Sequence, residues 1–102
     1  MGLRERTEDK LAQATLRLIY QAEKDYWMKY ETYCTSTVPI AGRCNSEGAI
    51  EDNLNLDLED TASDWAYTIT GNTNSFTATA APTGNVGSGT TWSINQHGGT
   101  NW

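Results

Sequence analysis

The sequence predicts an α+β domain in which a long N-terminal amphipathic helix packs on a small antiparallel sheet, a three-stranded meander. Two patterns carry this prediction. Residues 3–33 contain neither Gly nor Pro and are rich in good helix formers such as Ala, Leu, Gln, Glu, Lys and Arg. After Asp64, apolar side chains recur at every second position, which is the period of a strand. The 102 residues suffice for one domain, which we expect to comprise the helix (1–33), an acidic connector (34–64) and the sheet (65–102).

At about 100° per residue, a row of apolar and small side chains gathers on one face of the expected helix. The row consists of Leu11, Ala14, Thr15, Leu18, Ile19, Ala22, Tyr26, Tyr30 and Tyr33. We expect this face to pack on the sheet. A second strip projects from nearly the opposite side and holds Leu16, Tyr20 and Trp27. Two interpretations stay open for it: isolated apolar residues on the surface, which are normal, or a contact surface for another molecule.

The expected helix is long for its sheet. A helix of about 31 residues spans about 46 Å, whereas a strand of about six residues spans about 20 Å. The N-terminal end should extend beyond the sheet, because residues 3–10 are the most charged and least periodic part of the helix. Such a projecting helix favours a role in a larger assembly.

Three runs of alternating apolar residues predict the strands. They contain Trp65, Tyr67 and Ile69; then Phe76, Ala78 and Ala80; then Trp92 and Ile94. Turn residues 71–74 separate the first two runs, and Gly98 and Gly99 end the third. In the connector, Leu54, Leu56 and Leu58 fit a strand, while Ile50, Leu54 and Leu58 fit a short helix.

The charge is unevenly distributed. The chain has 7 Lys plus Arg against 13 Asp plus Glu, a net charge of -6, and all of the excess lies in residues 34–64. No charged residue occurs from Trp65 to Trp102. This balance argues against binding to nucleic acid or to acidic membranes. The mean hydropathy is -0.61, and no run approaches the roughly 20 apolar residues of a membrane-spanning helix.

The two cysteines, Cys34 and Cys44, favour a disulfide. Their spacing fits neither a CxxC redox motif nor a zinc knuckle, and His97 is the only histidine. A disulfide implies an oxidising compartment, and the alternative is a pair of free thiols in a cytosolic loop. We therefore expect no metal and no cofactor.

The sequence offers little for catalysis. His97 lies in an expected turn, without a nucleophile beside it. Paired carboxylates such as Asp57 and Glu59, or Glu51 and Asp52, are typical of a solvated acidic loop and lack the EF-hand pattern. No strand-to-helix context or Lys accompanies the glycines of residues 84–89, as a phosphate-binding loop would require. We predict no catalytic residue and no enzyme activity.

Four segments, taken in order, resemble type IV pilins and the pseudopilins of type II secretion. They are LAQATLRLIYQAEKDYWMKYETY, WAYTITG, SFTATAAPTG and TTWSINQHG. The first is similar to the exposed half of a pilin's long N-terminal helix, and the others to consecutive strands of a pilin head. The likeness covers roughly residues 10–100 and is diffuse. It implies a pilin-like fold.

The resemblance also implies a structural subunit of an extracellular or periplasmic filament, made of copies of this chain or related pilins. Such subunits carry a hydrophobic N-terminal segment, which a peptidase processes and which anchors the precursor in the inner membrane. We expect that the chain lacks this segment and is a monomer on its own. The expected assembly interface consists of Leu16, Tyr20 and Trp27, with Lys24 and Lys29 meeting the acidic connector of another subunit.

Two departures from the family stand out. Many pilins place their disulfide near the C-terminus, whereas Cys34 and Cys44 lie in the connector. The calcium site of the major pseudopilin needs acidic residues in a C-terminal loop, and no carboxylate side chain follows Asp64. The main alternative is a minor pilin at a filament tip that binds a surface, a glycan or DNA through Trp92 and Trp102. A third is an electron-conducting filament, based on the aromatic residues between Tyr20 and Tyr33.

Overall fold

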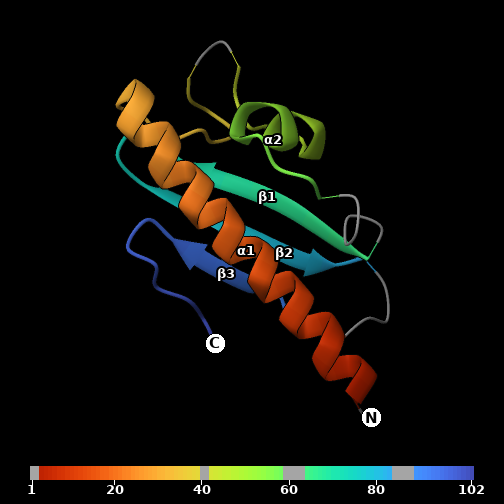
Figure 1. The fold of residues 1–102 in the computed structure, drawn as a ribbon. Helices are drawn as coiled ribbons and strands as arrows, with labels where there is room; N and C mark the ends of the chain where they lie inside the picture. The colour runs from red at the N-terminus through yellow and green to blue at the C-terminus, as the bar shows by residue number, and fades with distance from the viewer. Residues whose placement is uncertain (1–2, 40–41, 59–63, 84–88) are drawn as a thin grey trace.

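The computed structural model describes residues 3–39, 42–58, 64–83 and 89–102. It contains two helices, α1 (Leu3–Tyr30) and α2 (Glu47–Leu54), and three strands, β1 (Trp65–Gly71), β2 (Phe76–Pro82) and β3 (Trp92–Asn95). The strands form one antiparallel sheet in the order β1-β2-β3 (Figure 1). The expected α+β class and three-stranded meander are confirmed.

The helices lie on one face of the sheet. α1 crosses this face obliquely and contacts β2 and β3, while α2 lies beside β1 and touches α1 (Figure 1). A 28-residue helix is about 42 Å long, close to the 43 Å long axis of the molecule. The strands of seven residues reach only about 23 Å, so the N-terminal end of α1 runs past the sheet (Figure 1).

The sheet has a buried face and an exposed face, as strict alternation demands. Trp65, Tyr67 and Ile69 of β1 are buried, whereas Thr68 and Thr70 are exposed. The pairing of Ile69 with Ala78 and of Tyr67 with Ala80 keeps the apolar side chains of β2 on the same buried face. The predicted assignment of the faces of both strands is therefore confirmed.

A four-residue turn, 72–75, joins β1 to β2. The Asn72 Oδ1 atom accepts hydrogen bonds from the backbone N–H groups of Asn74 at 2.9 Å and Ser75 at 3.0 Å. Gly71, the last residue of β1, leads into the turn with φ at 141°, and a Cβ there would lie 2.2 Å from the Ser75 carbonyl oxygen. Only glycine fits this position, because the backbone of the opposite strand occupies the space of a side chain.

The buried face of α1 differs from the expected one. Ala12, Leu16, Ile19 and Glu23 are buried, whereas Leu18 is 58% exposed. At about 100° per residue, the buried arc is rotated by about a quarter turn from the row that includes Leu18 and Ala22. The assignment of Leu16, Tyr20 and Trp27 to the outer side of the helix was wrong: Leu16 is fully buried, and the two rings pack against the core.

The helix ends three residues earlier than expected, at Tyr30 rather than Tyr33. Glu31 has φ at 58°, in the left-handed region, and its N–H donates to the Trp27 carbonyl oxygen at 2.8 Å. This turn directs Tyr33 back into the core. There its ring lies 5.1 Å from that of Trp27 and 4.8 Å from that of Phe76.

The connector contains a helix, so the helical alternative is correct for residues 47–54. Ser46 caps α2 by accepting a hydrogen bond from the Ala49 N–H at 3.1 Å. Ile50 and Leu54 are buried on its inner side, and Leu58 is buried beyond its end. Glu59 lies outside the described residues.

The predicted disulfide between Cys34 and Cys44 is confirmed, with Cα atoms 5.4 Å apart. Both cysteines are buried in the core. The bridge closes the loop that leads from the end of α1 toward α2, and therefore restrains how the connector leaves the helix.

Candidate functional site

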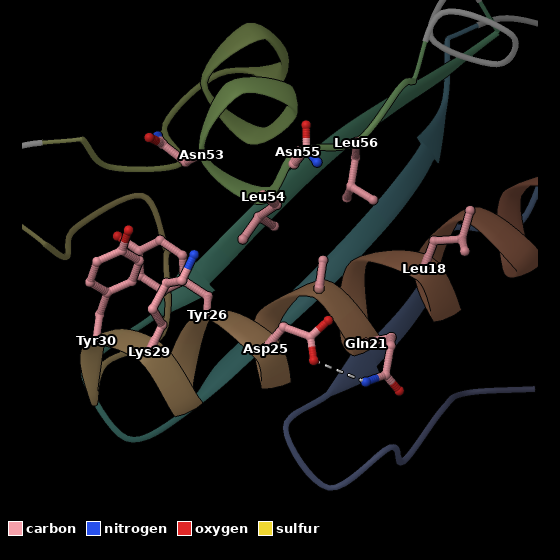
Figure 2. A pocket seen from close by; sticks show the side chains of 11 residues that line it. Leu18, Gln21, Asp25, Tyr26, Lys29, Tyr30, Asn53, Leu54, Asn55 and Leu56 are labelled. Carbon is pink, nitrogen blue, oxygen red and sulfur yellow. Dashed lines mark hydrogen bonds between the residues drawn. The ribbon is translucent and has the colours of Figure 1, made fainter.

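A groove of about 440 Å³ lies between α1 and the C-terminal end of α2 (Figure 2). Its walls hold apolar side chains at the base and polar ones along the rim. The lining residues are Leu18, Gln21, Ala22, Asp25, Tyr26, Lys29, Tyr30, Asn53, Leu54, Asn55 and Leu56. A groove with an apolar base and a few polar groups is the usual form of a binding site.

The α1 wall follows from helical spacing. Leu18, Ala22 and Tyr26 recur every four residues and therefore form one continuous row. Leu18 lies toward one end of the groove, and Tyr26 and Tyr30 lie at the other (Figure 2). The exposed fractions are 58% for Leu18 and 57% for Tyr30. This side of α1 thus offers apolar surface that its own chain leaves open.

The opposite wall is built by the end of α2. Asn55 adopts the left-handed conformation, with φ at 55°, and ends the helix. The Leu56 N–H then donates to the Glu51 carbonyl oxygen at 3.0 Å, which folds the chain back at this point. The side chains of Leu54 and Leu56 point down toward α1 (Figure 2). The groove therefore depends on the turn at Asn55.

The rim carries one charge of each sign. Asp25 and Lys29 are exposed and lie one turn apart on α1. Gln21 donates a hydrogen bond from Nε2 to the Asp25 Oδ1 atom at 3.4 Å. The rings of Tyr26 and Tyr30 are 4.5 Å apart, and burial is the main cause of the raised pKa of Tyr26. The groove is therefore apolar inside and polar at its edge.

The expected interface residues fall into two groups. Leu16 has no exposed surface, and the Trp27 ring is stacked on Tyr33, so both serve the core. Tyr20 is half-buried, packs against the core and lies beside Gly98. Of the expected apolar strip, no member forms part of the groove.

The two lysines of the expected assembly interface differ in their surroundings. Lys24 donates a hydrogen bond from Nζ to the Tyr33 hydroxyl at 3.2 Å, and it lies 5.4 Å from the centre of the Tyr20 ring. Lys29 is exposed on the groove rim. Only Lys29 combines an exposed ammonium group with a place at the candidate site.

Two acidic residues of α2 are engaged within the chain. The Glu47 Oε1 atom accepts a hydrogen bond from the Tyr67 N–H at 3.3 Å, and the Glu51 Oε2 atom accepts one from the Leu58 N–H at 2.9 Å. These carboxylates attach α2 to β1 and to the segment that follows α2. Part of the negative charge of the connector therefore stabilises the fold of the chain itself.

Trp92 and Trp102, the residues of the tip-module alternative, lie together. Their rings meet edge to face with centroids 5.9 Å apart. The Trp92 Nε1 atom donates to Asp9 Oδ1 at 3.2 Å, and the Arg17 guanidinium lies 5.5 Å from the centre of the Trp102 ring. Both rings thus help attach the C-terminal segment to α1, and glycan stacking by them stays a prediction.

His97 lies exposed in the turn after β3, where its ring contacts Gln96. Across the described ranges, no group of three His, Cys, Asp or Glu side chains is arranged to hold a metal ion. In the same ranges, no helix combines the length and the apolar character needed to cross a membrane.

No protein-family model matches the chain, and no characterised protein and no solved structure is significantly similar to it.

Sequence reasoning missed the groove, although part of its signal is present. Leu18, Ala22 and Tyr26 were expected to face the sheet, and they instead form the groove wall. Asn55, which is among the residues most tolerant of the left-handed conformation, is a recognisable end signal for α2. Nothing in the sequence indicates that Glu23 is buried, because ionisable side chains are usually exposed.

Proposed function

We propose that the chain is the globular part of a subunit of a type IV pilus or type II secretion pseudopilus, and that it acts by assembly into a helical filament. One observation carries this proposal. α1 is anchored on its own sheet along one side and leaves Leu11 and Leu18 exposed on the other, where Leu18 also lines the groove. The order of the segments that resemble pilins agrees with the α1-to-sheet order of the fold.

The exposed apolar surface supports a contact with another subunit. Leu11 is 44% exposed and Leu18 58% exposed, two helical turns apart on the same side of α1. Burying apolar surface contributes about 25 cal/mol per Å², so two leucines add a modest amount at each contact. A filament multiplies such contacts along its length, which suits a chain that we expect to be a monomer on its own.

The proposed interface therefore replaces the apolar part of the expected one. Leu11 and Leu18 take the place of Leu16, Tyr20 and Trp27, which serve the chain's own core. Lys29 remains in the interface, because its ammonium group is exposed at the groove rim. An acidic connector segment of a neighbouring subunit is its complementary partner.

Leu18→Glu in the full-length protein should abolish or sharply reduce filament formation, because it places a charge where apolar surface must be buried. The same change in the isolated chain should alter the free energy of unfolding by no more than about 0.5 kcal/mol, since Leu18 is exposed. Electron microscopy of cells labelled with an antibody to this chain measures the first effect, and urea unfolding measures the second.

The matched control is Thr70→Glu, which adds a charge to the exposed face of the sheet away from α1. This variant should still form filaments. Normal filaments from Leu18→Glu, or an absence of filaments even from the unaltered full-length protein in the organism that encodes it, would contradict the proposal.

A further inference from the structure

A carboxyl group is enclosed where α1 meets the disulfide loop. Glu23 is fully buried on the sheet side of α1. Its Oε1 atom accepts a hydrogen bond from the Cys34 backbone N–H at 2.8 Å. Within the ranges that the structure describes, its Oε2 atom has no hydrogen-bond partner. Burying a carboxylate that is neither paired nor fully hydrogen-bonded is costly, so this site favours the neutral acid.

Charged side chains of α1 and α2 that could approach Glu23 have hydrogen-bond partners of their own. From α1, the Lys24 ammonium group donates to the Tyr33 hydroxyl of the connector. From α2, the Glu47 and Glu51 carboxylates accept backbone N–H groups. The sheet contributes no charge, because residues 65–102 contain none.

Within one turn of Glu23 along α1, the titratable side chains are Tyr20, Lys24, Asp25 and Tyr26. Tyr26 lies one turn after Glu23. Its pKa is raised mainly by burial and to a lesser extent by Tyr30 and Glu23. An ionised Tyr26 would repel an ionised Glu23 and would not stabilise it. The described surroundings therefore offer no cation that compensates a carboxylate at position 23.

We propose that Glu23 is a proton-dependent latch: as a neutral acid it holds the disulfide loop against α1, and loss of its proton loosens this attachment and the α2 wall of the groove. The link to the groove is covalent and short. The backbone N–H that Glu23 binds belongs to Cys34, whose disulfide to Cys44 leads directly to the cap of α2 at Ser46. An ionised Glu23 needs water, and water reaches it only when α1 and this loop separate.

The direction of the pH effect follows from the same burial. Burial raises the pKa of Glu23 from 4.5 to about 8, against a smaller lowering by the Cys34 N–H. In the unfolded chain the carboxyl has its ordinary pKa, so the folded state holds an extra proton between these two values. The contribution of Glu23 to stability is thus complete below about pH 4.5 and is lost as the pH rises through about 8.

The test is a pH titration of this chain followed by nuclear magnetic resonance. The Glu23 Cδ resonance, the Cys34 amide resonance and the methyl resonances of Leu54 and Leu56 should all shift together, with one apparent pKa near 8. Glu23→Gln should remove this shared transition. The Gln side chain keeps an oxygen for the Cys34 N–H but has no proton to lose in this range.

Unfolding measured at several pH values provides the second readout. In the unaltered chain, one extra proton in the folded state lowers the folding equilibrium constant about tenfold per pH unit between about pH 5 and pH 7.5. Glu23→Gln should remove this slope. Asp25→Asn, which neutralises an exposed carboxylate two residues away on α1, should retain it.

Three results would overturn the latch. The first is a Glu23 Cδ titration at the ordinary carboxyl pKa, and the second is a Cys34 amide that does not follow Glu23. The third is a Glu23 transition near pH 8 without any response of Leu54 and Leu56, which would remove the link to the groove. If Glu23→Gln fails to fold, the titration of the unaltered chain alone tests the latch by the same three criteria. None of these results depends on filament assembly.

Discussion

Leu16→Ala should lower the free energy of unfolding by about 2 to 5 kcal/mol, whereas Leu18→Ala should change it by no more than about 0.5 kcal/mol. Leu16 is fully buried between α1 and the sheet, so its removal leaves a cavity. Leu18 is 58% exposed and loses few contacts. Urea unfolding followed by tryptophan fluorescence measures both values, since Trp65 lies in the core and reports on it.

The two leucines form a matched pair, because they are identical in chemistry and two residues apart on one helix. A face of α1 centred on Leu18 and Ala22, as the spacing of apolar residues predicts, would give the opposite order of effects. Equal losses at both positions, or a larger loss at Leu18, would contradict the packing of α1 described above.

Replacing both cysteines, as Cys34→Ser with Cys44→Ser, should lower the free energy of unfolding by about 3 kcal/mol. The bridge closes a loop with a sequence separation of 10, which restricts the unfolded chain. It also places both sulfur atoms in the core, where two serine hydroxyls would need new hydrogen bonds. Chemical unfolding measures the loss, with the unaltered chain in reductant as the comparison.

Mass measurement provides the control for this prediction. The unaltered chain should gain two hydrogen atoms under denaturing reduction, and the double-serine variant should gain none. Free thiols in the freshly purified chain, or equal stability with and without reductant, would contradict a structural disulfide.

The sheet could be predicted from the sequence because its signal is local and strict. Within residues 65–70 and again within residues 76–80, every second residue is apolar or small, and the positions between them are mostly Thr. A one-residue shift in the pairing of the strands would turn the large apolar side chains, such as Trp65 and Phe76, toward solvent. The pattern therefore determines which face of the sheet is buried. The structure follows this pattern in both strands.

The orientation of α1 could not be predicted, because its buried arc contains an ionisable residue. Periodicity places Glu23 on the solvent side, since a buried carboxylate is normally excluded. The structure buries Glu23 with Leu16 and Ile19, and the Cys34 N–H supplies one hydrogen bond. This bond joins positions 11 residues apart and cannot be read from a helical pattern.

The groove was beyond sequence reasoning for a related reason. Its two walls come from α1 and from the end of α2, and the sequence left the connector undecided between a strand and a helix. Once Asn55 ends α2, Leu54 and Leu56 face α1 and define the second wall. The disulfide, in contrast, could be predicted because the sequence contains two cysteines at a suitable separation.

The most direct measurement of the central claim is the rate at which maleimide modifies a cysteine placed at position 18. In the isolated chain, Leu18→Cys should react quickly, Leu16→Cys should react slowly, and Thr70→Cys should match Leu18→Cys. In assembled filaments of the full-length protein, Leu18→Cys should become protected while Thr70→Cys remains reactive. Slow modification of Leu18→Cys in the isolated chain, or an unchanged rate in the filament, would contradict an outer side of α1 that is open in the monomer and covered by neighbouring subunits.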